Sequence, residues 1–199
     1  MATATKTVAR KSSNAITQSA IDNNGFTDVK ILRERARKGL DKGPITATYT
    51  IDRKQLIRRL NDALATEWVC VLRYSRHYFS ATGVLAESVR QEFLQHAKEE
   101  QAHADLIAQR IVQLGGDPDL DPATLAQRSH AEYKEGGNLR DMVRENLIAE
   151  RIAIDSYREL INWIGDRDTT TKRMLEGILA MEEDHADDFR DLLDGWIGD

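Results

Sequence analysis

Cysteine is almost absent from this chain of 199 residues, whose only thiol is Cys70. A single cysteine excludes a disulfide framework within the chain, a zinc ribbon and a rubredoxin-type iron site, because each of these needs two or more thiols. Stable disulfides belong to oxidising compartments, so this composition suits a reducing compartment.

Long apolar runs are also missing. No stretch approaches the roughly 18 uncharged apolar residues of a membrane-spanning helix, and the N-terminus carries no apolar run that resembles a signal peptide. We therefore expect a soluble, cytoplasmic protein with no membrane partner.

Proline is scarce, with three residues at positions 44, 118 and 122. The remainder is rich in Ala, Leu, Ile, Glu and Arg, most of which favour helices, and 41% of the residues are hydrophobic. A chain of this length and composition can bury one substantial core. We predict an all-α domain with an appendage.

Basic residues are concentrated at one end of the chain. Residues 1–50 carry nine Lys and Arg against four Asp and Glu, whereas the rest carries 19 against 29. Because residues 1–27 lack a sustained apolar period, we expect residues 1–50 to form a flexible basic extension. Residues 28–40 are predicted to form a short amphipathic helix that stops near Gly43; a solvated spacer is the alternative.

Four long amphipathic patterns occupy residues 51–199, with apolar side chains every three or four positions. Asp52 is placed to cap the first helix, and Asn138 to cap the third. The pair Gly115-Gly116 ends the second helix. The predicted helices cover residues 52–81, 85–114, 138–165 and 168–196.

The connections between these helices predict the topology. The first and second helices, and the third and fourth, are joined by a few residues, so each pair forms an antiparallel hairpin. Residues 116–137 separate the second helix from the third and are long enough to cross the whole bundle. We therefore expect a four-helix bundle with one long crossover; a surface loop between two ordinary hairpins is the alternative.

Each predicted helix places a glutamate where its core-facing stripe should be apolar. Two of these glutamates are followed by a histidine at the third position, which puts both groups on one helix face. All lie near the middle of their helices, so they should meet at one level of the bundle. The convergent set is Glu67, Glu100, His103, Glu150, Glu182 and His185.

Burial of four carboxylates needs compensation, because an unpaired buried charge costs several kcal/mol and like charges repel. No Arg or Lys falls on these core stripes at that level. Two divalent cations would neutralise the carboxylates and leave the imidazoles as neutral ligands, and this ligand set is the di-iron carboxylate pattern of helix bundles. If the helix phasing is wrong, these residues are instead salt-bridged surface groups.

With these residues identified, the chain resembles the bacterioferritin and Dps-like branch of the ferritin superfamily. The resemblance covers roughly residues 50–194, through the segments LNDALATEWVCVLRY, HAKEEQAHADLIAQRIVQLGG, NLIAERIAIDSY and ILAMEEDHADDF. It implies a ferritin-like four-helix bundle whose copies assemble into a hollow shell.

The resemblance also implies a role for each site residue. Glu67 and His103 would be terminal ligands of one iron, and Glu150 and His185 would serve the other. Glu100 and Glu182 would bridge the two metals, which gives two Fe per subunit. Tyr74, seven residues after Glu67, would lie beside the metals and supply an electron during oxidation; an ordinary core tyrosine is the alternative.

Three departures from the family pattern refine these expectations. Gln101 stands where haem-binding bacterioferritins carry the axial methionine, so haem is not expected. Only 14 residues follow His185, too few for the fifth helix of 24-subunit cages, and we therefore favour a dodecamer. Cys70 lacks the partner cysteine that often accompanies such centres in Dps-like relatives.

The predicted function is iron storage and detoxification, in which a ferroxidase oxidises Fe(II) with O2 or H2O2 and ferric mineral is deposited in the shell. A non-storage di-iron or di-manganese peroxidase or catalase is an alternative. A protector that binds DNA through the basic extension is another. Of the remaining histidines, His96 is a candidate accessory iron ligand, whereas His77 and His130 are unassigned.

Overall fold

The computed structural model describes residues 21, 25–84 and 86–196, and their regular secondary structure is helical apart from one isolated β-bridge. The chain divides into two compact units, residues 1–48 and 49–199. Most of the predicted flexible tail, residues 1–27, lies outside the described residues. No helix in the described part of the chain is both long and apolar enough to cross a membrane.

The first unit contains a short helix, as predicted, although it is shorter than residues 28–40. Helix α2 spans Val29–Ala36, and the Asp28 carboxylate caps it by accepting hydrogen bonds from the Lys30 and Ile31 amides at 2.8 and 3.4 Å. A 3-10 turn, η1 (Leu40–Lys42), follows Gly39, whose φ of 66° lies in the left-handed region that glycine adopts readily.

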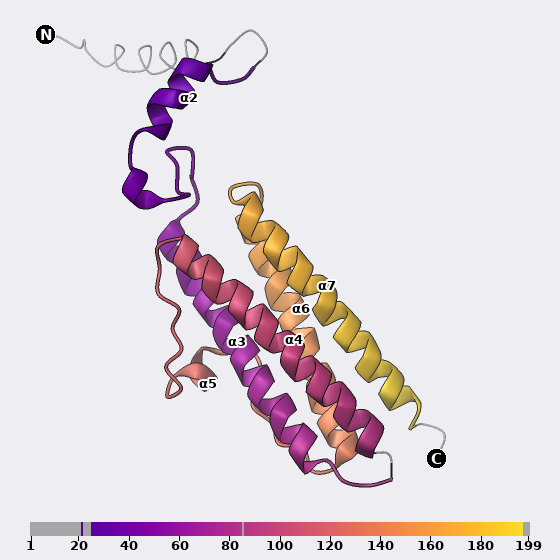
Figure 1. Cartoon of the computed structure of the whole chain (residues 1–199). Coiled ribbons are helices and arrows are strands. Elements are labelled where there is room, and N and C mark those ends of the chain that lie inside the picture. Colours follow the sequence, from indigo (N-terminus) through magenta and orange to yellow (C-terminus); the bar gives the residue numbers. More distant parts are fainter. Residues whose placement is uncertain (1–20, 22–24, 85, 197–199) are drawn as a thin grey trace, which may run out of the picture. The chain divides into compact units, whose positions relative to one another are not determined.

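The second unit is a bundle of four long helices (Figure 1). The Asp52 and Asn138 side chains accept hydrogen bonds from the Gln55 and Asp141 amides at 3.0 Å each, which confirms both predicted caps. Gly115, at φ 74°, ends the second helix of the bundle as predicted. The four helices are α3 (Arg53–Ser80), α4 (Ala86–Gln113), α6 (Leu139–Ile164) and α7 (Thr169–Asp194).

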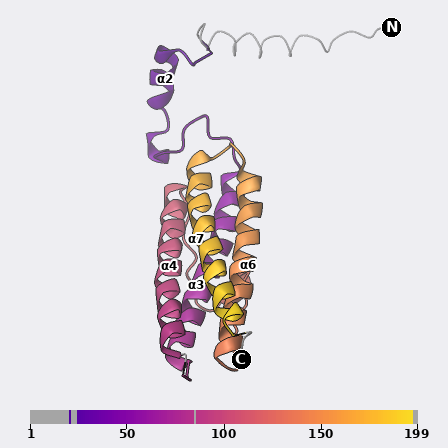
Figure 2. The same cartoon turned by 90° about the vertical axis from the view of Figure 1, so that its right-hand side faces the viewer.

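The long crossover between α4 and α6 makes these two helices parallel, as predicted, and Figure 2 shows both running in the same direction. Asn61 of α3 holds the crossover by accepting a hydrogen bond from the Asp119 amide at 2.7 Å and donating to the Asp117 carbonyl at 3.2 Å. One short helix in the crossover was not predicted. Helix α5 (Leu125–Arg128) forms where Leu125 packs against Ala65 and Val69 of α3.

Two apolar layers enclose the middle of the bundle. One consists of side chains near the N-terminal ends of α3 and α7 and the C-terminal ends of α4 and α6, including Leu56, Leu60, Ile107, Ile111, Ile164 and Leu175. The other includes Tyr74, Phe93, Val143 and Phe189. Polar side chains between these layers are shielded from solvent on both sides.

Candidate metal centre

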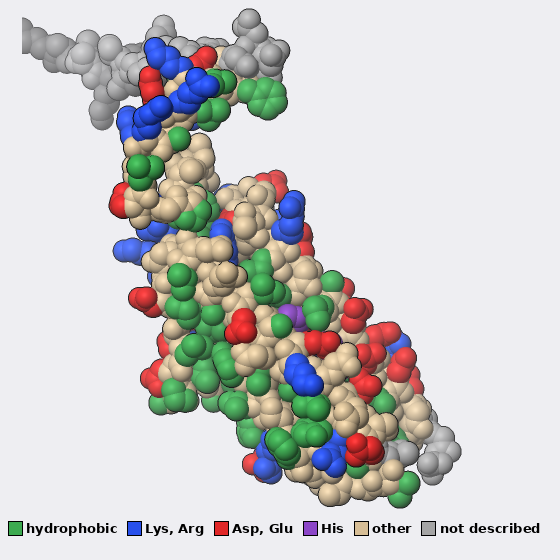
Figure 3. All heavy atoms as spheres, viewed as in Figure 1, with side chains coloured by type: hydrophobic (Ala, Val, Ile, Leu, Met, Phe, Trp, Pro, Cys, Tyr) green, Lys and Arg blue, Asp and Glu red, His purple; other side chains and the backbone are tan. Residues whose placement is uncertain are grey.

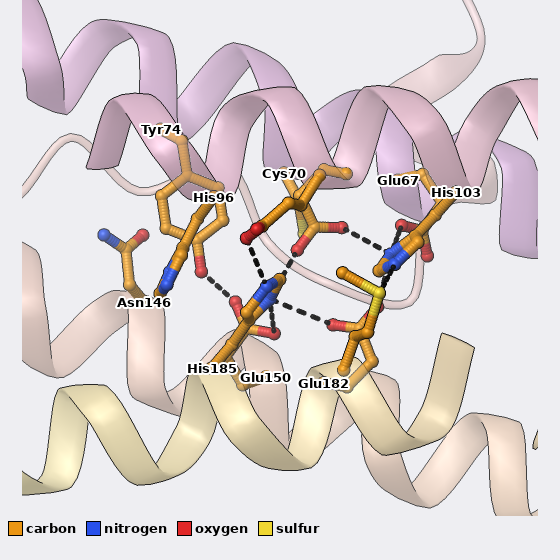
Figure 4. Close-up of polar contacts among 12 residues, drawn as sticks. Glu67, Cys70, Tyr74, His96, His103, Asn146, Glu150, Glu182 and His185 are labelled. Atoms are coloured by element: carbon orange, nitrogen blue, oxygen red, sulfur yellow. Dashed lines mark hydrogen bonds and ion pairs between the residues drawn. The ribbon is translucent and has the colours of Figure 1, made fainter. Parts of the chain in front are cut away.

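Each long helix contributes one buried carboxylate to the middle of the bundle, and α4 and α7 each add a histidine (Figure 4). The four carboxylates are each 1% exposed, and the two imidazoles are 2% and 3% exposed. The structure therefore brings together all six residues of the predicted set, which are Glu67, Glu100, His103, Glu150, Glu182 and His185.

His103 lies at the centre of one ligand group. Its Nδ1 is 3.0 Å from Oε1 of Glu182 and 3.4 Å from Oε2 of Glu67. Oε2 of Glu100 lies 3.8 Å from the same nitrogen. One ligand atom from each of these four residues lies within 4.8 Å of the others, a separation at which a single cation can bind them all.

His185 lies at the centre of a second group. Its Nδ1 is 3.4 Å from Oε1 of Glu100 and 3.8 Å from Oε2 of Glu150. Oε2 of Glu182 lies 4.0 Å away. Glu100 and Glu182 thus belong to both groups, and each directs a different oxygen toward each imidazole.

Two tyrosines bind the carboxylates that are not shared. The Tyr74 hydroxyl donates a hydrogen bond to Oε1 of Glu150, and the Tyr157 hydroxyl donates to Oε1 of Glu67. Tyr74 therefore lies beside the site, as the family resemblance suggested. Tyr157 was not singled out from the sequence, although it follows Glu150 by seven residues just as Tyr74 follows Glu67.

The two imidazoles differ in what their outer nitrogens contact. Nε2 of His185 lies 2.9 Å from Oε2 of Glu99, a carboxylate whose side chain is 29% exposed. Nε2 of His103 lies 3.4 Å from the Met181 sulfur. A carboxylate behind a ligating histidine fixes its tautomer and raises its basicity, so the two halves of the centre are chemically unequal.

Without a cation, the carboxyl groups must share protons. Burial and the neighbouring Glu100 carboxylate raise the pKa of Glu67 well above its usual value. The same causes raise the pKa of Glu182. The pKa of Glu100 is lowered although burial acts in the other direction, because close polar contacts with Glu67, His103 and His185 stabilise its charged form.

The imidazoles gain protons for the complementary reason. Burial disfavours the charged ring, but the close polar contacts of its Nδ1 with the Glu100 and Glu67 carboxylates outweigh it and raise the pKa of His103 to about 9. Close polar contacts with Glu100 and Glu150 likewise raise the pKa of His185 to about 11. The metal-free site is thus a set of charged and protonated groups in ion-pair contact, and several of its oxygens and both Nδ1 atoms have no partner with hydrogen-bond geometry within the protein.

The ligand atoms of the two groups fit two divalent transition-metal ions such as Fe(II). Carboxylate oxygens and imidazole nitrogens are ligands for Fe, Zn and Mn, and thiolate ligands are absent from both groups. Two divalent cations balance four carboxylates and give the unpartnered ligand atoms a partner.

A buried cation that the sequence analysis did not identify lies on α3, between one and two helical turns beyond the site. Arg73 of α3 is 1% exposed, so a cation does lie on a core-facing stripe, six residues after Glu67. Its Nε donates to the Asn146 side chain at 2.8 Å and its guanidinium also donates to the Glu132 carbonyl at 3.1 Å. Arg73 is therefore bound by Asn146 and the crossover backbone and does not neutralise a site carboxylate directly.

The other histidines occupy different environments. His77 is buried, with Nδ1 accepting from the Asn146 amide at 3.1 Å and Nε2 donating to the Lys134 carbonyl at 3.0 Å. Burial and the nearby Arg73 lower the pKa of His77 to about 4. His96 is buried beside His185, and burial and the His185 charge lower its pKa to about 3. His130 is exposed and belongs to neither ligand group.

A four-helix bundle with one long crossover and two buried carboxylate–histidine groups that share two glutamates is the arrangement of ferritin-like carboxylate proteins. Residues 57–196 match the model of the ferritin-like domain, and the chain belongs to this family.

Relatives within the family agree with the resemblance to Dps and bacterioferritin. The chain is 32% identical over 137 residues to a nutrient stress-induced DNA-binding protein of Synechococcus sp., covering 66% of this chain and 77% of the relative. It is 32% identical to a bacterioferritin of Brucella melitensis, covering 70% and 83%.

Among solved structures, the bacterioferritin-related protein of Bacteroides fragilis, described as a dodecameric thioferritin, superposes with a TM-score of 0.71 at 36% identity. The match covers 74% of this chain and 89% of that one. Family membership and the buried ligand groups support iron storage and protection as the function, with an oxidoreductase activity on iron.

Proposed function

We propose that each subunit binds two Fe(II) ions at the centre of the bundle, oxidises them to Fe(III) and passes the product to a ferric mineral inside a hollow shell. Iron is here the substrate and the cargo. The observation that carries the proposal concerns Glu100 and Glu182. Each of these carboxylates directs one oxygen toward His103 and the other toward His185, at 3.0 to 4.0 Å.

The proposed ligand roles follow from this arrangement of the shared carboxylates. Glu67 and His103 hold one iron, and Glu150 and His185 hold the other. Glu100 and Glu182 bridge the pair. Four carboxylates then balance the charge of two Fe(II) ions, which compensates for their burial.

Oxidation of two Fe(II) ions releases as many electrons as O2 or H2O2 takes up in a two-electron reduction. Two Fe(II) ions supply two electrons, which with two protons reduce O2 to H2O2 or H2O2 to two water molecules. Hard oxygen ligands favour the ferric product. The Tyr74 hydroxyl donates a hydrogen bond to Glu150 and thereby orients that terminal ligand.

The proposed assembly is a dodecamer, supported by the 36% identity to a protein described as dodecameric. Haem is not part of the proposal, because Gln101 is a partly exposed side chain that donates to Asp105 at 3.1 Å and has no thioether to offer as an axial ligand.

Anaerobic Fe(II) titration combined with particle sizing tests the proposal. We expect about two Fe(II) per subunit to bind tightly. On admission of air, the same particle should take up far more iron. Glu182→Gln should abolish tight binding, whereas Glu176→Gln, an exposed glutamate on the same helix, should not. Binding of two ions by a small oligomer that never mineralises would instead favour the peroxidase or catalase alternative.

A second candidate function is DNA binding, favoured by the name of the Synechococcus relative and by the basic first unit. Around α2 the exposed basic side chains are Lys30, Arg33, Arg35, Arg37 and Lys38. Lys6, Arg10 and Lys11 of the predicted basic tail lie outside the described residues.

A gel shift tests this second function. Replacement of Arg33, Arg35 and Arg37 by Gln should weaken a salt-sensitive shift, because fewer phosphates are neutralised. The matched control replaces three exposed arginines of the bundle, namely Arg58, Arg140 and Arg144. Equal loss in both variants would mean that the extension has no special role.

A further inference from the structure

A separate group of ligand-bearing side chains lies beside the central site. Nε2 of His96 is 3.6 Å from Oδ2 of Asp188 on α7 and 4.0 Å from Oε2 of Glu92, one turn earlier on α4. One ligand atom of each lies within 4.8 Å of the others. None of the three belongs to the two central groups.

The buried imidazole of this group has no hydrogen-bond partner. His96 is 0% exposed, and neither of its ring nitrogens forms a hydrogen bond within the protein. His77, which is equally buried, has both nitrogens hydrogen-bonded. A buried polar atom without a partner destabilises the fold, because it has given up its hydrogen bonds to water and gained none in return. His96 thus has the environment of a metal ligand, whereas His77 has that of a structural core histidine.

Neighbouring rings fix the orientation of His96. It stacks on His185 with ring centroids 4.0 Å apart and planes inclined by 20°. The edge contacts with Phe189 and Tyr74 have centroid distances of 4.8 and 5.6 Å. The imidazole is therefore held in place below two carboxylates whose side chains remain 40% and 58% exposed. The two carboxylates thus lie between solvent and Nε2 of the buried ring, and a cation that binds them lies next to that nitrogen.

We propose that Glu92, His96 and Asp188 form a third divalent-metal site, one that receives Fe(II) from solvent before it enters the central pair. Ligand atoms of a cation bound at about 2.0–2.2 Å lie roughly 3–3.5 Å apart, so small side-chain rotations complete the site. With three protein ligands and the rest solvent, it binds more weakly than the central groups.

The residues around this third site could attract Fe(II) from solvent and pass it on to the central site. Acidic side chains gather over the C-terminal half of α7, where Asp184, Asp187 and Asp191 surround Asp188 (Figure 3). Such a field concentrates cations locally. On the inner side, Glu99 joins His96 and His185 in a group whose ligand atoms lie within 4.8 Å. Glu99 thus connects the outer site to the central one. This role as an entry site rests on the proposed function, but the site itself does not.

Anomalous diffraction from crystals of the full-length protein soaked anaerobically in Co(II) tests the proposal, because Co(II) binds the same ligands without being oxidised by the site. We expect two central peaks per subunit and a weaker third peak beside Nε2 of His96. In the double variant E92Q/D188N the third peak should be lost at Co(II) concentrations that saturate the wild type, with both central peaks retained. The matched control is Asp187→Asn, which removes one charge from the same helix without removing a member of the group, and it should keep three peaks.

The outcomes separate the two proposals. A wild type with two central peaks and no density beside His96 overturns the third site alone, and so does a third peak that persists in E92Q/D188N. A wild type without the central peaks overturns the proposed two-iron function, whatever is found at His96.

Discussion

At the scale of single residues, the site carboxylates fall into two kinds. Glu100 and Glu182 present their oxygens to two imidazoles, whereas Glu67 and Glu150 each give one oxygen to a tyrosine hydroxyl. The tyrosine bond leaves a terminal carboxylate one free oxygen, which favours binding to a single metal. Four glutamates of identical chemistry are thereby suited to different roles in metal binding by their neighbours alone.

Glu99 should act as a positioning residue for His185. Because Glu99 accepts from Nε2 of His185, Glu99→Gln should weaken metal binding on that side by about 10- to 100-fold. The His103 side, backed by Met181, should change much less. Site-resolved Zn(II) occupancy from anomalous diffraction measures the difference.

The control for this prediction is Glu183→Gln, an exposed glutamate of α7 that pairs with Arg158. Partial recovery in Glu99→Asp, which keeps the charge, would support positioning by a carboxylate. An equal loss of metal at both positions would instead indicate a general structural defect.

The metal-free protein should become less stable as the pH rises from about 7 to about 9. The folded protein raises the pKa values of His103 and His185 to about 9 and about 11. The stability that these two protonated rings contribute is therefore complete below the pKa of an unfolded histidine. It is lost as the pH rises through each raised pKa of the folded state. Each proton held only by the folded state gives a slope of about 1.4 kcal/mol per pH unit. His77 and His96 have lowered pKa values and are neutral in both states in this window.

Thermal unfolding of chelator-treated protein measures this effect, with Zn(II)-loaded protein as the control, because bound metal replaces the protons. We expect the unfolding midpoint of the metal-free form to fall with pH and that of the loaded form to change little. A metal-free midpoint that rises over the same range would contradict the proton assignment.

The candidate ligand residues could be predicted from the sequence, whereas two residues close to them, Arg73 and Tyr157, could not. Glu67, Glu100, Glu150 and Glu182 were found because a charged group on an apolar stripe needs a physical reason. Arg73 was missed because its compensation is the Glu132 carbonyl in the crossover, whose position no helical periodicity encodes. Tyr157 was missed because a tyrosine on a core face needs no special explanation.

At the scale of elements, the four long helices were predictable because their periodicity is sustained and their caps are local. The predicted first helix, residues 52–81, compares with Arg53–Ser80 in the structure. Helix α5 was not predictable, because four residues carry no period and its formation depends on contact between Leu125 and α3. Local signals therefore predict long elements, whereas short ones depend on tertiary contacts.

A buried ion pair at the N-terminal end of α7 stabilises this end of the bundle and should be sensitive to mutation. Arg110 of α4 binds Asp168 at 3.0 Å, and Asp168 also caps α7 by accepting from the Thr171 amide at 3.0 Å. Arg110→Met leaves this carboxylate buried without its cation, which should destabilise the fold by about 3–5 kcal/mol. Urea denaturation measures the loss. Arg173→Met, an exposed arginine of α7, should shift the midpoint far less, and equal shifts would show that the pair is not special.

At the scale of the whole molecule, charge is distributed unevenly along the chain. The net charge of −5 combines a basic first 50 residues with a strongly acidic remainder. The bundle, which contains the central site, is therefore suited to attract cations, whereas the extension is suited to anionic partners. One sequence thus carries two electrostatic surfaces.

Attraction of Fe(II) by the acidic bundle should make iron oxidation depend on salt only when iron is limiting. Raising the ionic strength from about 0.02 to about 0.3 M shortens the Debye length from roughly 20 to roughly 6 Å, which screens attraction from a distance. The initial rate at limiting Fe(II) should therefore fall. At saturating Fe(II) it should stay constant, because ligands that are 1% to 3% exposed are screened little by salt. Stopped-flow absorbance of the ferric product measures both rates, and choline chloride in place of NaCl controls for competition by Na⁺. A rate that falls equally at limiting and at saturating iron would place the salt effect at the central site and would contradict capture by the acidic surface.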